Sequence, residues 1–138
     1  MIDIIIGKKG SGKTKKLIEN ANEAASKTNG NVVVIEKGNK LTYDLSHDVR
    51  LVDIDAYGIQ GADALAGFVS GICAGNYDVT DILVDSTLKI VGSDLKVLIP
   101  FAEKMSSLSS LASTKITFSI SADESELPEE IRGISAIV

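Results

Sequence analysis

The sequence is poor in several residue types: it has one cysteine, no tryptophan and two prolines, and aromatic residues make up 4% of it. A single cysteine excludes an internal disulfide and agrees with a reducing compartment. No apolar run approaches the roughly 20 residues of a membrane span. The opening residues, MIDIII, lead into glycine and lysine rather than into a signal-peptide cleavage site. We therefore expect a cytoplasmic protein without a secretory signal or membrane insertion.

Histidine is equally scarce. His47 lies between Ser46 and Asp48, and no second histidine or cysteine follows at metal-ligand spacing, so we expect a surface histidine. The formal net charge is −5, which repels a polyanion, and nucleic acid is therefore not an expected partner. A length of 138 residues with 44% hydrophobic composition indicates a single domain, residues 1–138, with one real core.

Short apolar runs alternate with longer segments of helical period, the pattern of a parallel sheet covered by helices. The predicted fold class is therefore α/β, with a mostly parallel sheet of five or six strands. Their β-branched composition predicts burial on both faces. The expected strands are Ile2–Ile6, Val32–Ile35, Leu51–Ile54, Ile82–Val84 and Ile116–Ile120, with Ile134–Val138 as a possible edge strand.

Three helices are expected. The first begins near Lys13 and ends at Asn29-Gly30, and the second carries the apolar stripe 65–73, in which Cys73 is a core residue. For the third helix two possibilities stay open, because Pro100 either kinks a helix begun at Ser93 or opens a new one that runs to about Ala112. The segment from Gly38 to Val49 has turn residues but no helical stripe.

A glycine-rich loop joins the first predicted strand to the first predicted helix. Its sequence is Gly7-Lys8-Lys9-Gly10-Ser11-Gly12-Lys13-Thr14, which matches G-x-x-x-x-G-K-[ST] at every fixed position. Glycines let the backbone turn tightly and aim successive N–H groups at phosphate oxygens, and the helix N-terminus adds its dipole. We expect Lys13 to reach the β and γ phosphates and the Thr14 hydroxyl to bind Mg²⁺.

On these residues the chain resembles the P-loop NTPase superfamily. The resemblance implies a three-layer sandwich that binds a nucleoside triphosphate with magnesium. It also implies a carboxylate at the end of a neighbouring buried strand, where it binds the metal or its waters.

Two acids are candidates for that carboxylate. The run Ile82-Leu83-Val84-Asp85-Ser86 is similar to the Walker B strand of RecA-like ATPases, which favours Asp85. Asp55 is the alternative, because Asp55-Ala56-Tyr57-Gly58 reads D-x-x-G as in GTPases. For either acid, the structural alternative is a carboxylate that caps the turn after its strand.

The guanine-reading motif N-K-x-D of GTPases is missing after Asp55. Asn39-Lys40-Leu41-Thr42 lies too early in the chain and lacks the final aspartate. ATP is therefore the expected nucleotide. Tyr43 or Tyr57 could stack on the adenine, or either could serve packing instead.

No glutamate follows Asp85 to polarise an attacking water. RecA-like proteins carry such an acid on the strand after the first helix, and Glu36 is the residue at that place, although a solvated glutamate that begins a turn is the favoured interpretation. Lys8 occupies the position where MinD-like and ParA-like ATPases have a lysine that reaches across a dimer, and a solvated charge is the favoured alternative.

Only two arginines are present, Arg50 and Arg132. Small-molecule kinases resembling adenylate or shikimate kinase grip the transferred phosphoryl group with several arginines in a lid, so this class is disfavoured. Arg132 could act as a finger on a neighbouring subunit, but a surface ion pair is the favoured interpretation.

The leading hypothesis is a minimal RecA-like, Mg²⁺-dependent ATPase. In it Lys13 and Asp85 act in catalysis, and Thr14 and Asp85 hold the metal. The chain is also similar to small bacterial proteins described as twitching-motility or pilus-retraction ATPases. The alternative is a nucleotide-sensing switch that reports to a protein partner, or acts as a homo-oligomer, with little turnover.

Overall fold

The computed structural model describes residues 1–138 except 39, 42 and 43, and shows one six-stranded, all-parallel sheet in the order β3-β2-β4-β5-β1-β6. The predicted α/β class and the three-layer arrangement are confirmed. The strands are β1 (Ile2–Gly7), β2 (Asn31–Glu36), β3 (Val49–Asp53), β4 (Val79–Val84), β5 (Lys115–Ser121) and β6 (Ser135–Ile137).

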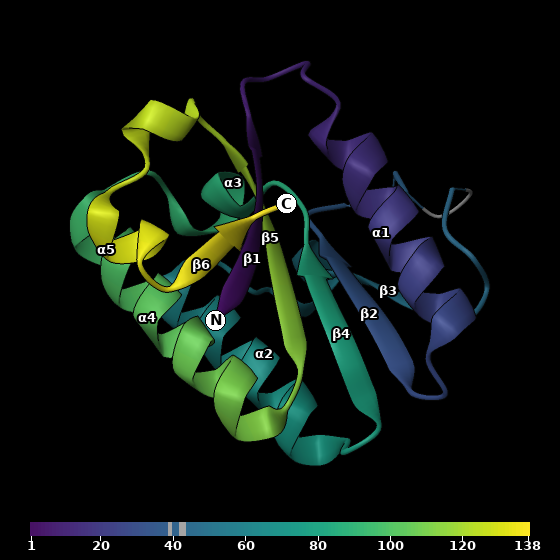
Figure 1. Cartoon of the computed structure of the whole chain (residues 1–138). Helices are drawn as coiled ribbons and strands as arrows, with labels where there is room; N and C mark the ends of the chain where they lie inside the picture. Colours follow the sequence, from purple (N-terminus) through teal and green to yellow (C-terminus); the bar gives the residue numbers. More distant parts are fainter. Residues whose placement is uncertain (39, 42–43) are drawn as a thin grey trace.

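The described helices divide unequally between the two faces of the sheet. On one face lies α1, and the others pack together on the opposite face (Figure 1). The α-helices are α1 (Lys13–Lys27), α2 (Ala62–Gly75), α3 (Thr87–Val91), α4 (Leu95–Ala112) and α5 (Glu129–Arg132), and the short 3-10 helices are η1 (Ile54–Tyr57) and η2 (Glu124–Glu126).

Alternation along each strand separates the hydrophobic core into two halves, because successive side chains point to opposite faces. On β1, Ile4 packs in the larger core under α2 and α4, whereas Ile5 packs against Leu17 and Ala21 of α1. On β5, Ile116 and Phe118 enter the larger core. Both faces of the sheet are thereby covered around the strands that carry the glycine-rich loop and Asp85.

Most element boundaries lie within a few residues of those expected. In the third helix Asp94 accepts a hydrogen bond from the Lys96 N–H, and α4 then runs from Leu95 to Ala112 with Pro100 inside it. Pro100 therefore does not open a new helix. Ile54 begins η1 instead of ending β3, and the short helix α3 was not expected.

Parallel pairing brings the carboxyl ends of all strands to the same edge of the sheet. The glycine-rich loop follows β1, Asp85 follows β4, and β5 lies between these two strands. In Figure 1 this edge is at the top, beneath the loop that leads into α1. The fold therefore brings the loop and Asp85, far apart in sequence, to one place.

Among the helices of the described residues, none combines the length and apolar character needed to cross a membrane.

Candidate functional site

Two glycines shape the loop between β1 and α1. Gly10 and Gly12 have φ of 84° and 90°, in the left-handed region that side-chain-bearing residues rarely adopt. Gly12 directly precedes α1, so its conformation turns the chain into the helix. At Gly7, a Cβ would collide with the Ser11 hydroxyl, which explains the first glycine of the motif.

The loop is closed by contacts with one carbonyl. The Lys8 carbonyl accepts a hydrogen bond from the Ser11 N–H at 3.1 Å and another from the Lys13 ammonium at 3.0 Å. Lys13 therefore folds back over the loop, and its charge lies beside the N–H groups that precede α1. An anion seated on the loop would meet this charge directly.

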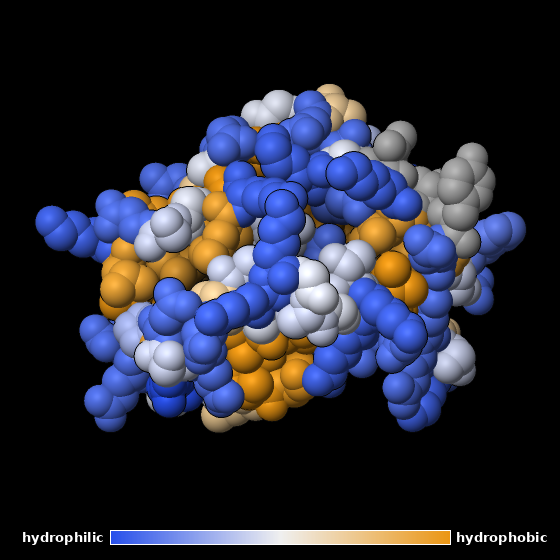
Figure 2. All heavy atoms as spheres, turned by 90° about the horizontal axis from the view of Figure 1, so that it is seen from above, coloured by the Kyte–Doolittle hydropathy of each residue, from blue (hydrophilic) through white to orange (hydrophobic). Residues whose placement is uncertain are grey.

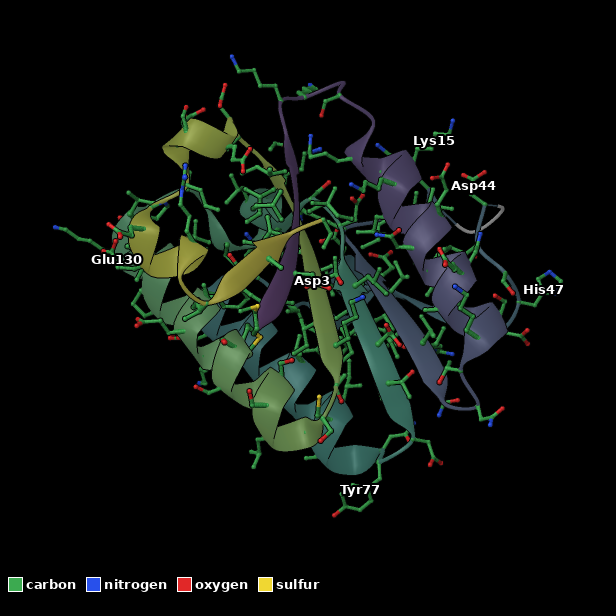
Figure 3. All side chains as sticks on the ribbon, in the orientation of Figure 1. Asp3, Lys15, Asp44, His47, Tyr77 and Glu130 are labelled. Atoms are coloured by element: carbon green, nitrogen blue, oxygen red, sulfur yellow. The ribbon has the colours of Figure 1, made fainter. Side chains whose placement is uncertain are left out.

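The first turn of α1 has an unusual charge distribution. It contains Lys13, Lys15 and Lys16 and no acid. Helix dipoles favour negative groups at the N-terminus, so lysines there are electrostatically unfavourable until an anion joins them. Lys13 and Lys15 line the cleft beside the loop, whereas Lys16 lines a different cavity. Lys15 points away from the sheet at the top of α1 (Figure 3). The turn is therefore suited to binding a polyanion such as a phosphate chain.

Asp85 lies at the end of β4 and is buried, with 7% of its surface exposed. The Thr14 hydroxyl oxygen is 3.4 and 3.5 Å from its two carboxylate oxygens. These distances exceed a good O–H···O hydrogen bond, so the hydroxyl and the carboxylate face each other across a small gap. The fold thus brings together oxygen atoms of two residues that are 71 positions apart in the sequence.

Ser119 on β5 fixes the orientation of Asp85. Its hydroxyl donates to Asp85 Oδ1 at 2.9 Å and accepts from the Ser86 N–H at 2.7 Å. Ser86 has a φ of 53°, a left-handed conformation that is uncommon for serine and is found at functional sites. Sequence reasoning missed Ser119, because the neighbourhood of β5 and β1 is known only from the strand order of the structure.

The side chain of Asp85 does not cap the following turn. The Ser86 N–H is bound by Ser119, and α3 has no side-chain cap. Asp53 is the capping acid instead, because its Oδ1 accepts from the N–H groups of Asp55 and Gly38, each at 2.9 Å.

A cleft of about 410 Å³ lies between the loop and α3, with β5 below it. Four lysines and only one acid, Asp85, line it, although the chain as a whole carries a net charge of −5. Figure 2, seen from above this end, shows mostly hydrophilic residues over the face. The lining residues are Lys9, Gly10, Gly12, Lys13, Thr14, Lys15, Asp85, Ser86, Leu88, Lys89, Ser119 and Ser121.

Other parts of the predicted loop site lie beside the cleft. Gly7, Lys8 and Ser11 do not line it. The Lys8 side chain is 77% exposed, with its ammonium 3.9 Å from Asp123. This exposure agrees with a solvated charge.

Asp55 lies far from the loop. It belongs to η1, after the edge strand β3, and three strands separate β3 from β1. Its half-exposed carboxylate pairs with Lys37 at 2.8 Å. The structure therefore joins Asp85, and not Asp55, to Thr14.

The expected ion pair of Arg132 is not among the ion pairs of the described residues, so that prediction is wrong. The guanidinium instead donates to the main-chain carbonyls of Leu127 and Glu124. Glu124 begins η2 and Leu127 follows it, so both carbonyls lie within eight positions of Arg132. Arg132 therefore holds the segment before α5.

Three minor predictions have clear outcomes. His47 is on the surface, in Figure 3 on the outer side of the molecule, and Cys73 is buried, both as predicted. Tyr57 is 62% exposed, stacks on Phe68 with ring centroids 6.5 Å apart, and does not line the cleft. Tyr43 lies outside the described residues, as do Asn39 and Thr42 of the Asn39-Thr42 segment.

Glu36 is buried, with 4% of its surface exposed, so the favoured interpretation of a solvated glutamate is wrong. Its Oε1 accepts a hydrogen bond from the Leu41 N–H at 3.3 Å. Burial raises the pKa of Glu36, the N–H groups of Leu41 and Lys40 oppose the rise, and the carboxylates of Asp85 and Asp53 add to it. The end of β2 thus places a second buried carboxylate near Asp85.

Replacing Glu36 by glutamine tests this pKa. A carboxyl group whose pKa is raised by folding stabilises the protein fully below its ordinary value of 4.5, and that stability is lost as the pH rises through the folded-state pKa. Glu36→Gln keeps the shape and the acceptor but removes the charge. We expect the variant to gain stability relative to the wild type as the pH rises above 4.5.

The measurement is the free energy of urea unfolding of both proteins at a series of pH values. A difference between the two that stays constant with pH would contradict the raised pKa.

In comparisons with known proteins, no family model matches the chain, and no curated protein matches it. A proposal for the function therefore rests on the sequence of the loop and on the geometry of the site.

Proposed function

We propose that this chain binds ATP with Mg²⁺ at the cleft and hydrolyses it. The observation that carries the proposal is the meeting of Thr14 and Asp85, 3.4 Å apart, at the mouth of a lysine-lined, glycine-rich loop. On this proposal the loop amides and Lys13 bind the phosphates. The preference for ATP rests on the sequence, which lacks N-K-x-D after Asp55. The protein would act in the cytoplasm.

The oxygen ligands suit Mg²⁺. This ion usually takes one or two protein oxygens and completes its octahedron with waters and substrate phosphates. Neighbouring oxygens of such an octahedron are roughly 3 Å apart, close to the 3.4 Å between Thr14 and Asp85. When bound there, Mg²⁺ would neutralise charge on the β and γ phosphates.

The residues of the chain divide the catalytic work between them. On this proposal Lys13 stabilises charge on the γ-phosphoryl oxygens, and the loop amides hold the β-phosphate in position. Asp85 keeps its orientation because Ser119 donates to it, so no rearrangement of the carboxylate is needed. Water is the acceptor. Glu36 is buried near Asp85 but does not line the cleft, so it would act on that water only through Asp85 or after a local rearrangement.

A nucleotide-sensing switch is the second candidate, and one observation favours it. The Glu36 carboxylate accepts from the Leu41 N–H, so it also binds the main chain at Leu41. If that is its role, nucleotide binding at Asp85 would be reported through Glu36 to Leu41 and to a protein partner or a second copy of the chain. Hydrolysis would then be slow.

A small-molecule kinase receives less support. Neither arginine lines the cleft: Arg50 is exposed on the edge strand β3, and Arg132 binds main-chain carbonyls.

Phosphate release from Mg·ATP, measured together with equilibrium binding, tests the proposal. We expect Lys13→Ala to lower the release rate by about 100-fold, because the group that stabilises the γ-phosphoryl charge is lost. The matched control is Lys16→Ala, since Lys16 lies in the same helical turn but lines a different surface cavity and not the cleft.

Each outcome decides between the candidates. Release that depends on Lys13 and not on Lys16 supports the ATPase, and tight binding without release supports the switch. Stabilisation by ATP and GTP shows the base preference, since a ligand at about 100 times its dissociation constant adds roughly 2.7 kcal/mol to the free energy of unfolding. If no triphosphate binds the wild-type chain, both candidates are wrong.

A further inference from the structure

The helix α3 is fixed firmly beside Asp85. Thr87 and Ile90 are each 1% exposed, and the Thr87 hydroxyl donates to the Val84 carbonyl. The Ile90 carbonyl accepts from the Gly61 N–H at 3.1 Å. Because α3 begins two residues after Asp85, its position relative to that carboxylate is set by the core and not by the solvent.

Lys89 is the exposed residue of α3. Its neighbours Ile90 and Val91 enter the core, whereas Leu88 and Lys89 line the cleft on the wall opposite the loop. Among the described residues, Lys89 forms no ion pair within 4.0 Å. The acid of the cleft, Asp85, is bound by Ser119. A cation without an acidic partner therefore faces the loop across the cleft.

We propose that Lys89 binds the terminal phosphate of the nucleotide and makes the site prefer triphosphates to diphosphates. This inference rests on the proposed function. The loop amides and the start of α1 form one wall, and Thr14 with Asp85 marks where the β and γ phosphates meet the metal. Lys89 follows Asp85 by four positions and lines the same cleft, so on this proposal it binds the phosphate that lies nearest the metal ligands.

Lysine would here take a task that arginine often performs. An arginine that neutralises γ-phosphoryl charge is common in phosphoryl transfer, but neither Arg50 nor Arg132 lines the cleft. Lys89 comes from the same chain and needs no second subunit to reach the cleft. A diphosphate lacks the group that Lys89 would bind, so loss of the lysine should weaken the triphosphate selectively.

Titration calorimetry with Mg²⁺ and two probes, the β,γ-imido analogue of ATP and ADP, tests the proposal. We expect Lys89→Gln to weaken binding of the analogue about tenfold and to leave ADP nearly unchanged, because a charge-assisted hydrogen bond is lost. Lys89→Arg should preserve the preference. Lys104→Gln, on α4 and outside the cleft, makes the same change in charge and should alter neither affinity.

Thermal melting of each variant confirms that it is folded. Equal weakening of both probes by Lys89→Gln would overturn the proposal, since it would show a general electrostatic effect, and so would an unchanged preference. If the wild type binds both probes and only the selectivity result fails, this inference alone is wrong. If the wild type binds neither probe, the proposed function fails and this inference fails with it.

Discussion

Asp85→Asn is expected to lower the rate of ATP hydrolysis by about 10²–10³-fold, the usual effect of removing one preorganised electrostatic group from an active site. Asparagine keeps the shape and can still accept the hydrogen bond from Ser119, but it is a poor Mg²⁺ ligand. Steady-state phosphate release over a range of Mg²⁺ concentrations measures the effect. The variant should also fail to regain the wild-type rate at high Mg²⁺.

Asp55→Asn is the matched control, because Asp55 is the other acid that the sequence offered. Its carboxylate is half exposed and pairs with Lys37, so the change should remove at most about 1 kcal/mol of stability. Hydrolysis should be unaffected. A loss of turnover in Asp55→Asn with normal turnover in Asp85→Asn would show that the carboxylate has been assigned to the wrong strand.

Phe118→Ala is expected to have the largest effect on stability. The ring is 2% exposed and packs edge-on against Phe101, with centroids 5.5 Å apart and planes at 72°. Truncating a buried phenylalanine costs about 3–5 kcal/mol, against a total stability of roughly 5–15 kcal/mol. At roughly 4 °C per kcal/mol for a chain of this size, the melting temperature should fall by about 12–20 °C.

Leu111→Ala provides the comparison, since Leu111 is also apolar but 85% exposed. Calorimetry should show a change within about 0.5 kcal/mol for it. Equal losses in the two variants would mean that the region between α4 and β5 is not packed as described.

The sequence was most informative where the decisive residues are neighbours along the chain. The glycine-rich loop is eight consecutive residues, and its flanking strand and helix have clear periodicity, so both could be predicted together. Asp85 could be predicted as a candidate because it ends an apolar run. The choice between Asp85 and Asp55 needed the strand order, because only that order shows which acid meets Thr14.

Contacts between distant segments could not be predicted from the sequence. Ser119 alternates with Phe118 and Ile120 like any serine on a strand, and nothing local shows that it binds Asp85. Glu36 lies on β2 between β3 and β4, so its burial depends on strands that are distant in the sequence. Lys89 lies in a five-residue helix too short for a periodic signal, which is why neither α3 nor its place in the cleft was expected.

The order of strands has a consequence for biosynthesis. Of the six strands, β1 is synthesised before the others, whereas its two neighbours in the sheet, β5 and β6, come after all the rest. Chains grow from the N-terminus at about 5–20 residues per second, so β1 spends several seconds without either partner. Until β5 pairs with it, the glycine-rich segment has no rigid support on that side. We expect nascent chains that stop before Lys115 to be unable to retain nucleotide.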